Sequence, residues 1–186
     1  MPNTLHTSKA FDTPSTSVPP LAETIYESPF GPIFLRVSDD VLLELHFLDG
    51  ALASTAQSPT TPAHPVFAEI FCWLDEYFSG RQPDFAPPLQ LDLTPFNRRV
   101  LEIASQVPFG ETMTYGEIAD LIAAERGLHK MSAQAVGSAM RKNPICLVIP
   151  CHRIIGAGGR LGGYNGNPLR KRQLLAHEGV DVSALV

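Results

Sequence analysis

The chain has 186 residues, of which 44% are apolar, so it can bury a hydrophobic core in one large or two small domains. Its three cysteines show no disulfide-framework spacing and no secretory leader precedes them, which predicts a reducing compartment, the cytoplasm. No apolar stretch is long enough to cross a membrane, so no membrane partner is expected.

The formal net charge is −5, which by itself argues against nucleic acid as a partner, but the charge is unevenly distributed. Residues 1–94 carry 3 Lys/Arg against 12 Asp/Glu, whereas residues 95–186 carry 11 against 7. The second half could therefore present a surface to phosphate groups, although an ordinary solvated face would have the same composition. The basic residues in question are Arg126, Lys130, Arg141, Lys142, Arg153, Arg170, Lys171 and Arg172.

Residues 1–20 are rich in Pro, Ser and Thr, which predicts a disordered tail. Apolar residues then alternate with polar ones in 33–37 and again in 41–47, and this pattern predicts a β-hairpin. From Val66 to Tyr77 apolar residues recur at helical spacing. Gly80 after this run predicts the end of a helix that contains Cys72, a residue we expect to be structural.

The segment 81–93 contains three prolines and predicts a linker with a domain boundary at its end. We therefore expect an N-terminal α+β domain with a small antiparallel sheet in residues 21–93. Residues 94–186 would form a second domain.

Four helix starts in the second domain are marked by a side chain that can accept a hydrogen bond from the first turn. They are Thr94, Thr114, Ser132 and Asn167. Glu117 completes a capping box with Thr114, and the Ser132 helix should run over 133–142. Two consecutive capped helices joined by a loop indicate a helix-turn-helix or winged-helix unit. The expected fold class is α/β, with a mostly helical, winged-helix-like C-terminal domain that carries the active site.

The helix over 133–142 has small side chains at Ala135, Gly137, Ser138 and Ala139. Small side chains allow a helix to lie very close to another surface. The sequence leaves open whether that surface is a packed helix or a DNA groove.

An apolar run from Ile145 to Ile149 predicts a buried extended segment that ends at Pro150. Cys151, His152 and Arg153 follow directly after Pro150. A thiol needs a base or a nearby cation to become nucleophilic, and these two neighbours can supply both, so Cys151 is a candidate reactive thiol. Cys146 lies within the apolar run and is expected to be a small buried hydrophobe.

The tetrapeptide Pro150-Cys151-His152-Arg153 is preceded by Asn143-Pro144 and followed by Gly163-Tyr164 and by Leu174-Leu175-Ala176-His177-Glu178-Gly179. This ordered combination resembles the O6-alkylguanine-DNA alkyltransferase family. The resemblance is close from about Thr94 to Gly179 and looser from about Thr24 to Asp92.

The resemblance implies roles for individual residues. Cys151 would be the nucleophile and His152 its base, acting through a water and oriented by Glu178. Tyr115 would donate a hydrogen bond or a proton to the base, and Asn143 would hold the turn that carries Cys151. The expected substrate-binding residues are Met140, Ile154, Gly163, Tyr164, Asn165 and Gly166. The expected DNA-binding residues are Gln134, Ala135, Gly137, Ser138, Arg141, Lys142 and Arg153.

The resemblance also implies a reaction. The partner would be double-stranded DNA containing O6-alkylguanine, with O4-alkylthymine open as a second substrate. The damaged nucleotide would be flipped out of the duplex, and its alkyl group would pass irreversibly to Cys151 in a single turnover. We expect a monomer without a cofactor. His6, His46, His64 and Cys72 lack close paired-ligand spacing, so no metal is predicted.

The chain departs from the family pattern at position 134, in the loop from Ala123 to Ala133, which is longer than in the shorter relatives, and at Asn167-Pro168, where a glycine is commoner. Gln134 stands where many relatives have an arginine that fills the gap left by the flipped base. Glutamine can hydrogen-bond the orphaned base, but it cannot supply charge.

Two other functions remain open. A lesion-binding relative would flag alkylated DNA without repairing it, but such proteins lack the cysteine present here at position 151. A Cys-His-Glu hydrolase would act on small acyl substrates, and the basic second half argues against it.

Overall fold

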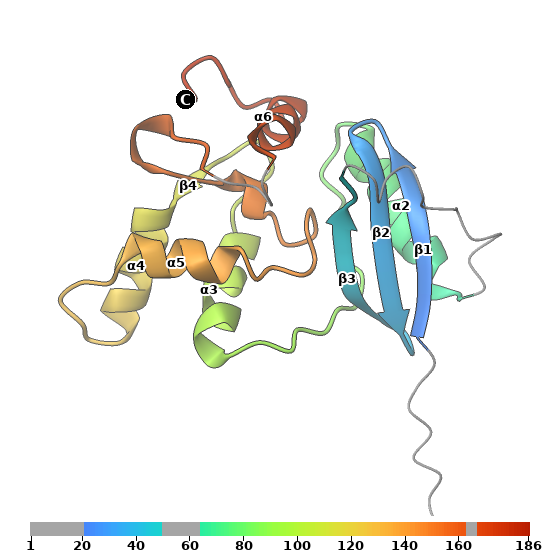
Figure 1. The fold of residues 1–186 in the computed structure, drawn as a ribbon, viewed down its shortest axis with the longest axis horizontal. Coiled ribbons are helices and arrows are strands. Elements are labelled where there is room, and N and C mark those ends of the chain that lie inside the picture. The colour runs from blue at the N-terminus through green and yellow to red at the C-terminus, as the bar shows by residue number, and fades with distance from the viewer. Residues whose placement is uncertain (1–20, 50–63, 163–166) are drawn as a thin grey trace, which may run out of the picture.

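A computed structural model gives the fold shown in Figure 1 and describes residues 21–49, 64–162 and 167–186. A small sheet backed by a helix forms one side of the molecule, and the remaining helices form the other. The predicted tail at residues 1–20 lies outside the described residues. Within the described ranges, no helix is both long and apolar enough to cross a membrane.

The sheet consists of β1 (Leu21–Ser28), β2 (Gly31–Ser38) and β3 (Val41–Phe47), antiparallel and in that order. The predicted hairpin is confirmed as β2 and β3. Alternate residues of β2 face the core because side chains on a strand point to opposite faces, and Ile33 and Leu35 are fully buried. The sequence did not predict β1, because Thr24 is its one buried residue and the strand carries no alternating apolar pattern.

Helix α2 (Val66–Phe78) covers one face of the sheet, and its apolar stripe, which includes Phe67, Ile70 and Tyr77, joins the main core. Gly80 follows it with φ of 82°, a left-handed conformation that glycine adopts without steric cost. The helix end is therefore where the sequence predicted it. Cys72 is exposed on this helix, so it does not contribute to the core.

The outer edge of β3 is occupied by two segments from elsewhere in the chain. Leu42 accepts a hydrogen bond from Gln90 (3.0 Å) and donates one to Pro88 (2.8 Å), both in the predicted linker. Leu45 donates to Pro144 (2.8 Å) and accepts from Cys146 (2.7 Å). The backbone of β3 therefore forms hydrogen bonds on its outer edge at both Leu42 and Leu45. The bonds of Leu45 connect the N-terminal sheet directly to residues 144–146, which precede Cys151.

Three helices begin at the predicted caps. They are α3 (Pro95–Ser105), capped by Thr94, α4 (Tyr115–Glu125), capped by Thr114, and α5 (Ala133–Met140), capped by Ser132. The capping box is complete, since Thr114 Oγ1 accepts from the Glu117 amide at 3.1 Å and the Glu117 carboxylate accepts from the Thr114 amide at 2.7 Å. Helices α4 and α5 pack on each other and on α3. The fold class is α/β, as predicted.

Helix α5 ends at Met140, two residues earlier than the Lys142 end expected from the sequence. A residue before proline is sterically excluded from helical conformation, which disfavours Asn143 as part of the helix. The Asn143 side chain is also used elsewhere: it bonds the backbone of the following loop at both ends, Ile145 N and Ile149 O.

The run Ile145–Ile149 is buried, as predicted, but it is not a continuous extended segment. The chain reverses within it, with hydrogen bonds from Val148 N to Cys146 O (2.9 Å) and from Ile149 N to Ile145 O (3.1 Å). Leu147 has a φ of 68°, which costs a non-glycine residue about 1–2 kcal/mol. The periodicity of apolar residues could not reveal this turn, because its two ends are held together by Asn143.

The remaining elements assemble around this loop. A short 3-10 helix, η1 (Cys151–Arg153), follows Pro150 and leads into β5 (Ile154–Ile155), which pairs in parallel with β4 (Met113–Thr114). A second 3-10 turn, η2 (Ala157–Gly159), comes next, and α6 (Pro168–His177) begins at the predicted cap Asn167. The β4–β5 pairing brings the start of α4 close to η1, and α6 packs on η1.

Candidate active site

Cys151 is the first residue of η1, and its position depends on the two hydrogen bonds by which the Asn143 side chain holds the ends of the preceding loop. The Asn143 amide donates to Ile149 O at 2.9 Å, two residues before Cys151. Cys151 N then donates to Ile149 O at 2.8 Å, which bends the chain sharply at Pro150. The Cys151 side chain is buried but lines a cavity that opens beside α5.

The surroundings of Cys151 lower the pKa of its thiol. The largest effect is a hydrogen bond with the Cys146 side chain. Burial acts in the opposite direction, and a hydrogen bond with Asn143 and the positive charge of Lys171 add to the lowering. Cys146 is therefore buried, as the sequence predicted, but it also contacts the candidate nucleophile. A thiol with a lowered pKa has a larger thiolate fraction near neutral pH and reacts faster.

His152 follows Cys151 and is fully buried against Glu178, with Nε2 and Oε1 only 2.6 Å apart. Burial lowers the pKa of His152, and the carboxylate of Glu178 partly offsets that effect. The contact with a carboxylate assigns the Nε2 proton, which makes Nδ1 the basic nitrogen of a neutral ring. Base-assisted activation of a thiol requires a neutral, oriented imidazole, and His152 has both properties.

Glu178 is the C-cap of α6, where the helix dipole disfavours a carboxylate. Its position is explained by the donors that surround it. Arg153 approaches it with Nε at 2.8 Å from Oε2 and Nη2 at 3.0 Å from Oε1, and the Tyr77 hydroxyl donates to Oε1 at 2.8 Å. Burial would raise the pKa of Glu178, but its hydrogen bonds and charge contacts with His152 and Arg153 prevail and lower it to about 2. Glu178 is therefore ionised at neutral pH.

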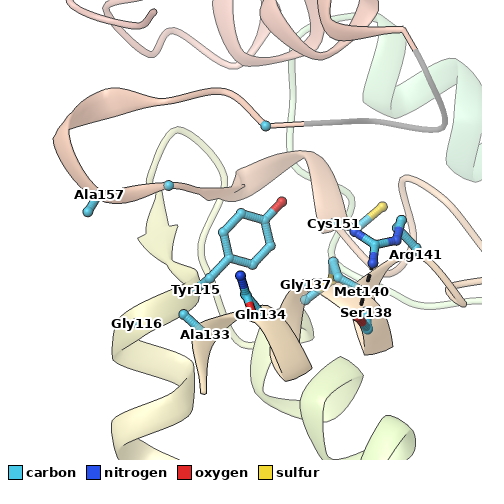
Figure 2. A pocket seen from close by; sticks show the side chains of 12 residues that line it. Tyr115, Gly116, Ala133, Gln134, Gly137, Ser138, Met140, Arg141, Cys151 and Ala157 are labelled. Atoms are coloured by element: carbon cyan, nitrogen blue, oxygen red, sulfur yellow. Dashed lines mark hydrogen bonds between the residues drawn. The ribbon is translucent and has the colours of Figure 1, made fainter. Parts of the chain in front are cut away.

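The cavity has a volume of about 680 Å³, enough for a small ligand of aromatic-ring size. Figure 2 shows Tyr115 and Cys151 among the residues around it, with the α5 residues Gln134, Gly137 and Met140 along its lower side. Gly162 has a φ of 65°, and a Cβ there would lie 3.4 Å from the Tyr115 hydroxyl, so glycine permits this close approach. The residues lining the cavity are Tyr115, Gly116, Ala133, Gln134, Gly137, Ser138, Met140, Arg141, Cys151, Gly156, Ala157 and Gly162.

The structure brings most of the predicted site residues together around this cavity. Tyr115, Gln134, Gly137, Ser138, Met140, Arg141 and Cys151 line it, and His152, Glu178 and Asn143 lie behind Cys151. Ala135 and Lys142 belong to the same end of the molecule but do not line it, and Lys142 is exposed. The predicted residues Gly163, Tyr164, Asn165 and Gly166 lie outside the described residues.

Two backbone carbonyls at the site, those of Ile154 and Cys151, already accept hydrogen bonds within the chain. The Ile154 carbonyl accepts one from Lys171 Nζ at 2.5 Å, and the Cys151 carbonyl accepts one from Ile154 N. A carbonyl oxygen has two lone pairs, so each keeps one acceptor site.

The prediction that Arg153 contacts DNA is wrong. Its guanidinium is buried, paired with Glu178 and bonded to Val107 O at 2.7 Å, so it anchors the site from inside. Arg170 and Lys171 are also buried, and Arg172 bonds carbonyls near the C-terminus. The basic cluster expected to face phosphate therefore reduces to Arg126, Lys130, Arg141 and Lys142, which are exposed.

The sequence missed two residues of the site. Tyr77 appeared as one more apolar position of a helix, and nothing local signals a hydrogen bond to Glu178, 101 residues away. Lys171 appeared as part of a basic surface, yet it is fully buried, bonds Ile154 O and lies 5.7 Å from the centre of the Tyr115 ring. Burial lowers the pKa of Lys171 to about 8, and the negative charge of Cys151 acts against that lowering.

Among the described residues, no cluster of three or more His, Cys, Asp and Glu side chains is arranged to hold a metal ion. The predicted absence of a metal remains a prediction.

Two family models match the chain. Residues 95–180 match the DNA binding domain of 6-O-methylguanine DNA methyltransferase, and residues 21–93 match its ribonuclease-like domain. The methylated-DNA–protein-cysteine methyltransferase of Mycobacterium leprae is 40% identical over 152 residues, which are 82% of this chain and 88% of that protein. The protein of the same name from Sulfurisphaera tokodaii is 37% identical over 165 residues, covering 87% and 96%.

Solved structures give the same result. The O6-methylguanine methyltransferase of Mycobacterium tuberculosis superposes with a TM-score of 0.70 at 37% identity, covering 89% of this chain and 95% of that one. The OGT of the same organism in complex with DNA also has a TM-score of 0.70, at 39% identity, covering 88% and 94%. The chain therefore belongs to the methylated-DNA–protein-cysteine methyltransferase family, which repairs DNA by transferring an alkyl group to a cysteine of the protein.

Proposed function

We propose that this chain repairs O6-alkylguanine in double-stranded DNA by moving the alkyl group onto Cys151. The observation that carries the proposal is the position of Cys151: it lines the same cavity as Tyr115, and the residue after it, His152, is held by Glu178. Nucleophile, base and orienting carboxylate thus occur in the order that activated-cysteine chemistry needs.

The first step is deprotonation of Cys151. Its proton passes to Nδ1 of His152, through one water, while Glu178 stabilises the imidazolium that forms. The lowered pKa of the thiol reduces the free energy of this step. Glu178 stays ionised throughout, because its pKa lies far below neutral pH.

In the second step the thiolate sulfur attacks the alkyl carbon and the bond between that carbon and guanine O6 breaks. The bonding electrons remain on guanine, whose ring then takes up a proton or a hydrogen bond. Tyr115 is the proposed donor. Burial, with a smaller contribution from the negative charge of Cys151, raises the pKa of Tyr115, so its hydroxyl is protonated and able to donate. The thioether product has no good leaving group, so each molecule reacts once.

The base must leave the duplex before the thiol can reach it. We propose that α5 lies against the minor groove, where the small residues Ala135, Gly137 and Ser138 permit close approach. Gln134, which is exposed on the cavity rim, would enter the stack and bond the orphaned base. Arg141 and Lys142 are exposed at the end of α5 and would contact phosphates.

The proposed organisation has a boundary near residue 93, with an N-terminal part at 21–93 and the DNA-binding part at 94–186. We also propose that the protein acts as a monomer. The reaction as written needs no cofactor. It needs a reduced thiol, which supports the cytoplasm as its compartment.

The test is transfer of labelled methyl from a duplex containing O6-methylguanine, followed by mass spectrometry of the peptide that contains Cys151. A methyl-sized adduct on Cys151 in the wild type, absent from Cys151→Ala, is expected. Cys151→Ala should still bind the duplex, because the proposed contacts lie on α5. Binding without any adduct would instead favour a lesion-binding protein, and turnover of a thioester without an adduct would favour a hydrolase.

A further inference from the structure

Tyr77 lies in α2, far from Cys151 in the sequence, yet its hydroxyl reaches the buried carboxylate behind the active site. The hydroxyl donates to Glu178 Oε1 at 2.8 Å, and the same oxygen atom of Tyr77 lies 3.4 Å from His152 Nε2. Since Nε2 contacts Oε1 at 2.6 Å, Tyr77 and His152 share one carboxylate oxygen. No step of the proposed reaction so far uses this residue.

The Tyr77 ring is held rigidly in place. It is fully buried, stacks on Trp73 with ring centres 5.5 Å apart and planes 5° from parallel, and meets Phe109 edge-on at 6.0 Å. Its carbonyl contacts Nε2 of His177 at 2.9 Å, which ties α2 to the end of α6 next to Glu178. The hydroxyl therefore has a defined position and little freedom to turn away from Glu178.

We propose that Tyr77 is a positioning residue for the His152–Glu178 pair, supplied by the N-terminal part of the chain. It acts through Glu178 and does not contact the reacting atoms. By donating to Oε1 it stabilises the carboxylate as an anion and competes with the His152 proton for the same oxygen. The proton then stays on Nε2, and the imidazole remains neutral, so that it can take up the proton of the Cys151 thiol at Nδ1.

Tyr77 is suited to be a permanent donor in this contact. Burial raises the pKa of its hydroxyl, and the negative charge of Glu178 raises it further, so the phenol keeps its proton over the whole working range of pH. Without the hydroxyl, Oε1 would lose a donor and bind the His152 proton more tightly. The pKa of His152 would rise, because the charged imidazolium would be better stabilised by a less neutralised carboxylate.

Other titratable groups also lie near His152 and Glu178, and some of them influence the pKa of His152. From η1 these are Cys151 and Arg153, and from α6 they are Lys171 and His177. The positive charges of Arg153 and Lys171 act to lower the pKa of His152 and remain when Tyr77 is changed. Removal of the Tyr77 hydroxyl is therefore expected to raise the pKa of His152, which burial has already lowered.

The inference rests on the proposed function, and its test uses one readout that does not need DNA. The variant is Tyr77→Phe, which removes one oxygen atom and keeps the ring. The matched control is Tyr26→Phe, because Tyr26 donates a similar hydrogen bond, 2.7 Å to Asp75 of the same helix, but does so at the surface and away from the site. Both are made in the full-length chain, and thermal unfolding checks that they fold.

The first readout is the pKa of His152, which is measured by NMR of its ring nitrogens over a range of pH. We expect Tyr77→Phe to raise this pKa and Tyr26→Phe to leave it unchanged. The same substitution in a Glu178→Gln background should produce no further shift, because the effect passes through the carboxylate. A merely structural tyrosine would leave the pKa of His152 in place, and that result would overturn the proposal.

The second readout is the single-turnover rate of methyl transfer against pH. Tyr77→Phe should lower the rate about 3- to 10-fold near neutral pH, a modest part of the 10²–10⁴-fold effect typical of proton transfer by a positioned side chain. It should move the acidic limb of the profile to higher pH, since neutral His152 is required. A uniform loss at every pH with an unchanged limb would contradict the inference.

The two readouts separate the inference from the proposed function. If the wild type transfers no methyl group, the proposed function fails, but the His152 titration still decides the role of Tyr77. If Tyr77→Phe does not fold, 3-fluorotyrosine at position 77 keeps the hydroxyl and makes it a stronger donor. The pKa of His152 should then fall, and no change would overturn the proposal.

Discussion

Arg153 and Glu178 form a two-point ion pair inside the protein, with Nε 2.8 Å from Oε2 and Nη2 3.0 Å from Oε1. Both side chains are buried, and Arg153 also donates a hydrogen bond to the carbonyl of Val107, just beyond the end of α3. One guanidinium thus joins η1, α6 and the α3 terminus. Arg153 thereby holds in place the Glu178 carboxylate, which orients His152, the residue before Arg153 in the chain.

Arg153→Ala should destabilise the protein by about 3–5 kcal/mol, because it leaves the Glu178 carboxylate buried without its cation. The free energy of unfolding in urea measures this loss. Arg99→Ala is the control, since Arg99 pairs with Glu125 and Glu102 at the surface, where solvent screens the ion pairs, and it should change the free energy of unfolding far less than Arg153→Ala does. Equal losses for the two variants would mean that the buried pair contributes no more than a surface pair.

Cys146→Ala should raise the pKa of the Cys151 thiol, because it removes the hydrogen bond that lowers it most. The rate of alkylation by iodoacetamide should therefore fall several-fold near neutral pH and recover fully at a pH above the thiol pKa. Mass spectrometry of the peptide that contains Cys151 follows the reaction over this range.

Cys72→Ala is the matched control, since Cys72 is exposed on α2, and it should leave the Cys151 profile unchanged. A Cys146→Ala profile that is lowered equally at all pH values would point to a packing defect and not to an effect on the thiolate.

Gln134→Ala should slow methyl transfer on duplex DNA, because the amide would no longer bond the orphaned base and offset part of the few kcal/mol that unstacking costs. It should slow transfer from a single strand much less, since no partner base is left behind there. Gln134→Arg should preserve or improve duplex repair and make it more sensitive to salt.

Single-turnover rates on paired and unpaired substrates separate these effects. Equal losses for Gln134→Ala on both would show that Gln134, which lines the cavity, supports the pocket and not base flipping.

Lys142→Ala should flatten the dependence of DNA affinity on salt by about 0.9 in the log-log slope if Lys142 neutralises one phosphate. Affinities measured between low and moderate salt give that slope. Arg81→Ala, which removes one exposed charge beyond the end of α2, is the control and should leave the slope unchanged. Binding that does not depend on salt would contradict a phosphate surface at the end of α5.

Local signals predicted the elements that frame the site. Thr94, Thr114, Ser132 and Asn167 each cap a helix where expected, because a cap bonds an amide only two or three residues ahead. The β2–β3 hairpin was predicted for the same reason, since its alternation is contained within the two strands. The spacing around Cys151, together with the resemblance to a known family, also predicted the nucleophile, its neighbour His152 and the partner Glu178 as candidates.

Long-range contacts decided what the local pattern could not. The turn at Leu147 exists because Asn143 holds both ends of the loop, and the loop is fixed to Leu45 of β3, about one hundred residues earlier in the chain. β1 forms through pairing with β2 and not through a pattern of its own. The sequence therefore determined which chemical groups are present and where helices begin.

Only the tertiary structure decided which charges face solvent and which lie inside. In sequence Arg153, Arg170 and Lys171 are indistinguishable from Arg141 and Lys142, yet the first three are buried and the last two are exposed. The same holds for Tyr77, an apolar-stripe residue whose hydroxyl meets Glu178. The physical reason is that burial of a charge or hydroxyl depends on a partner that the fold brings near, and residues 101 positions apart carry no mark of that pairing.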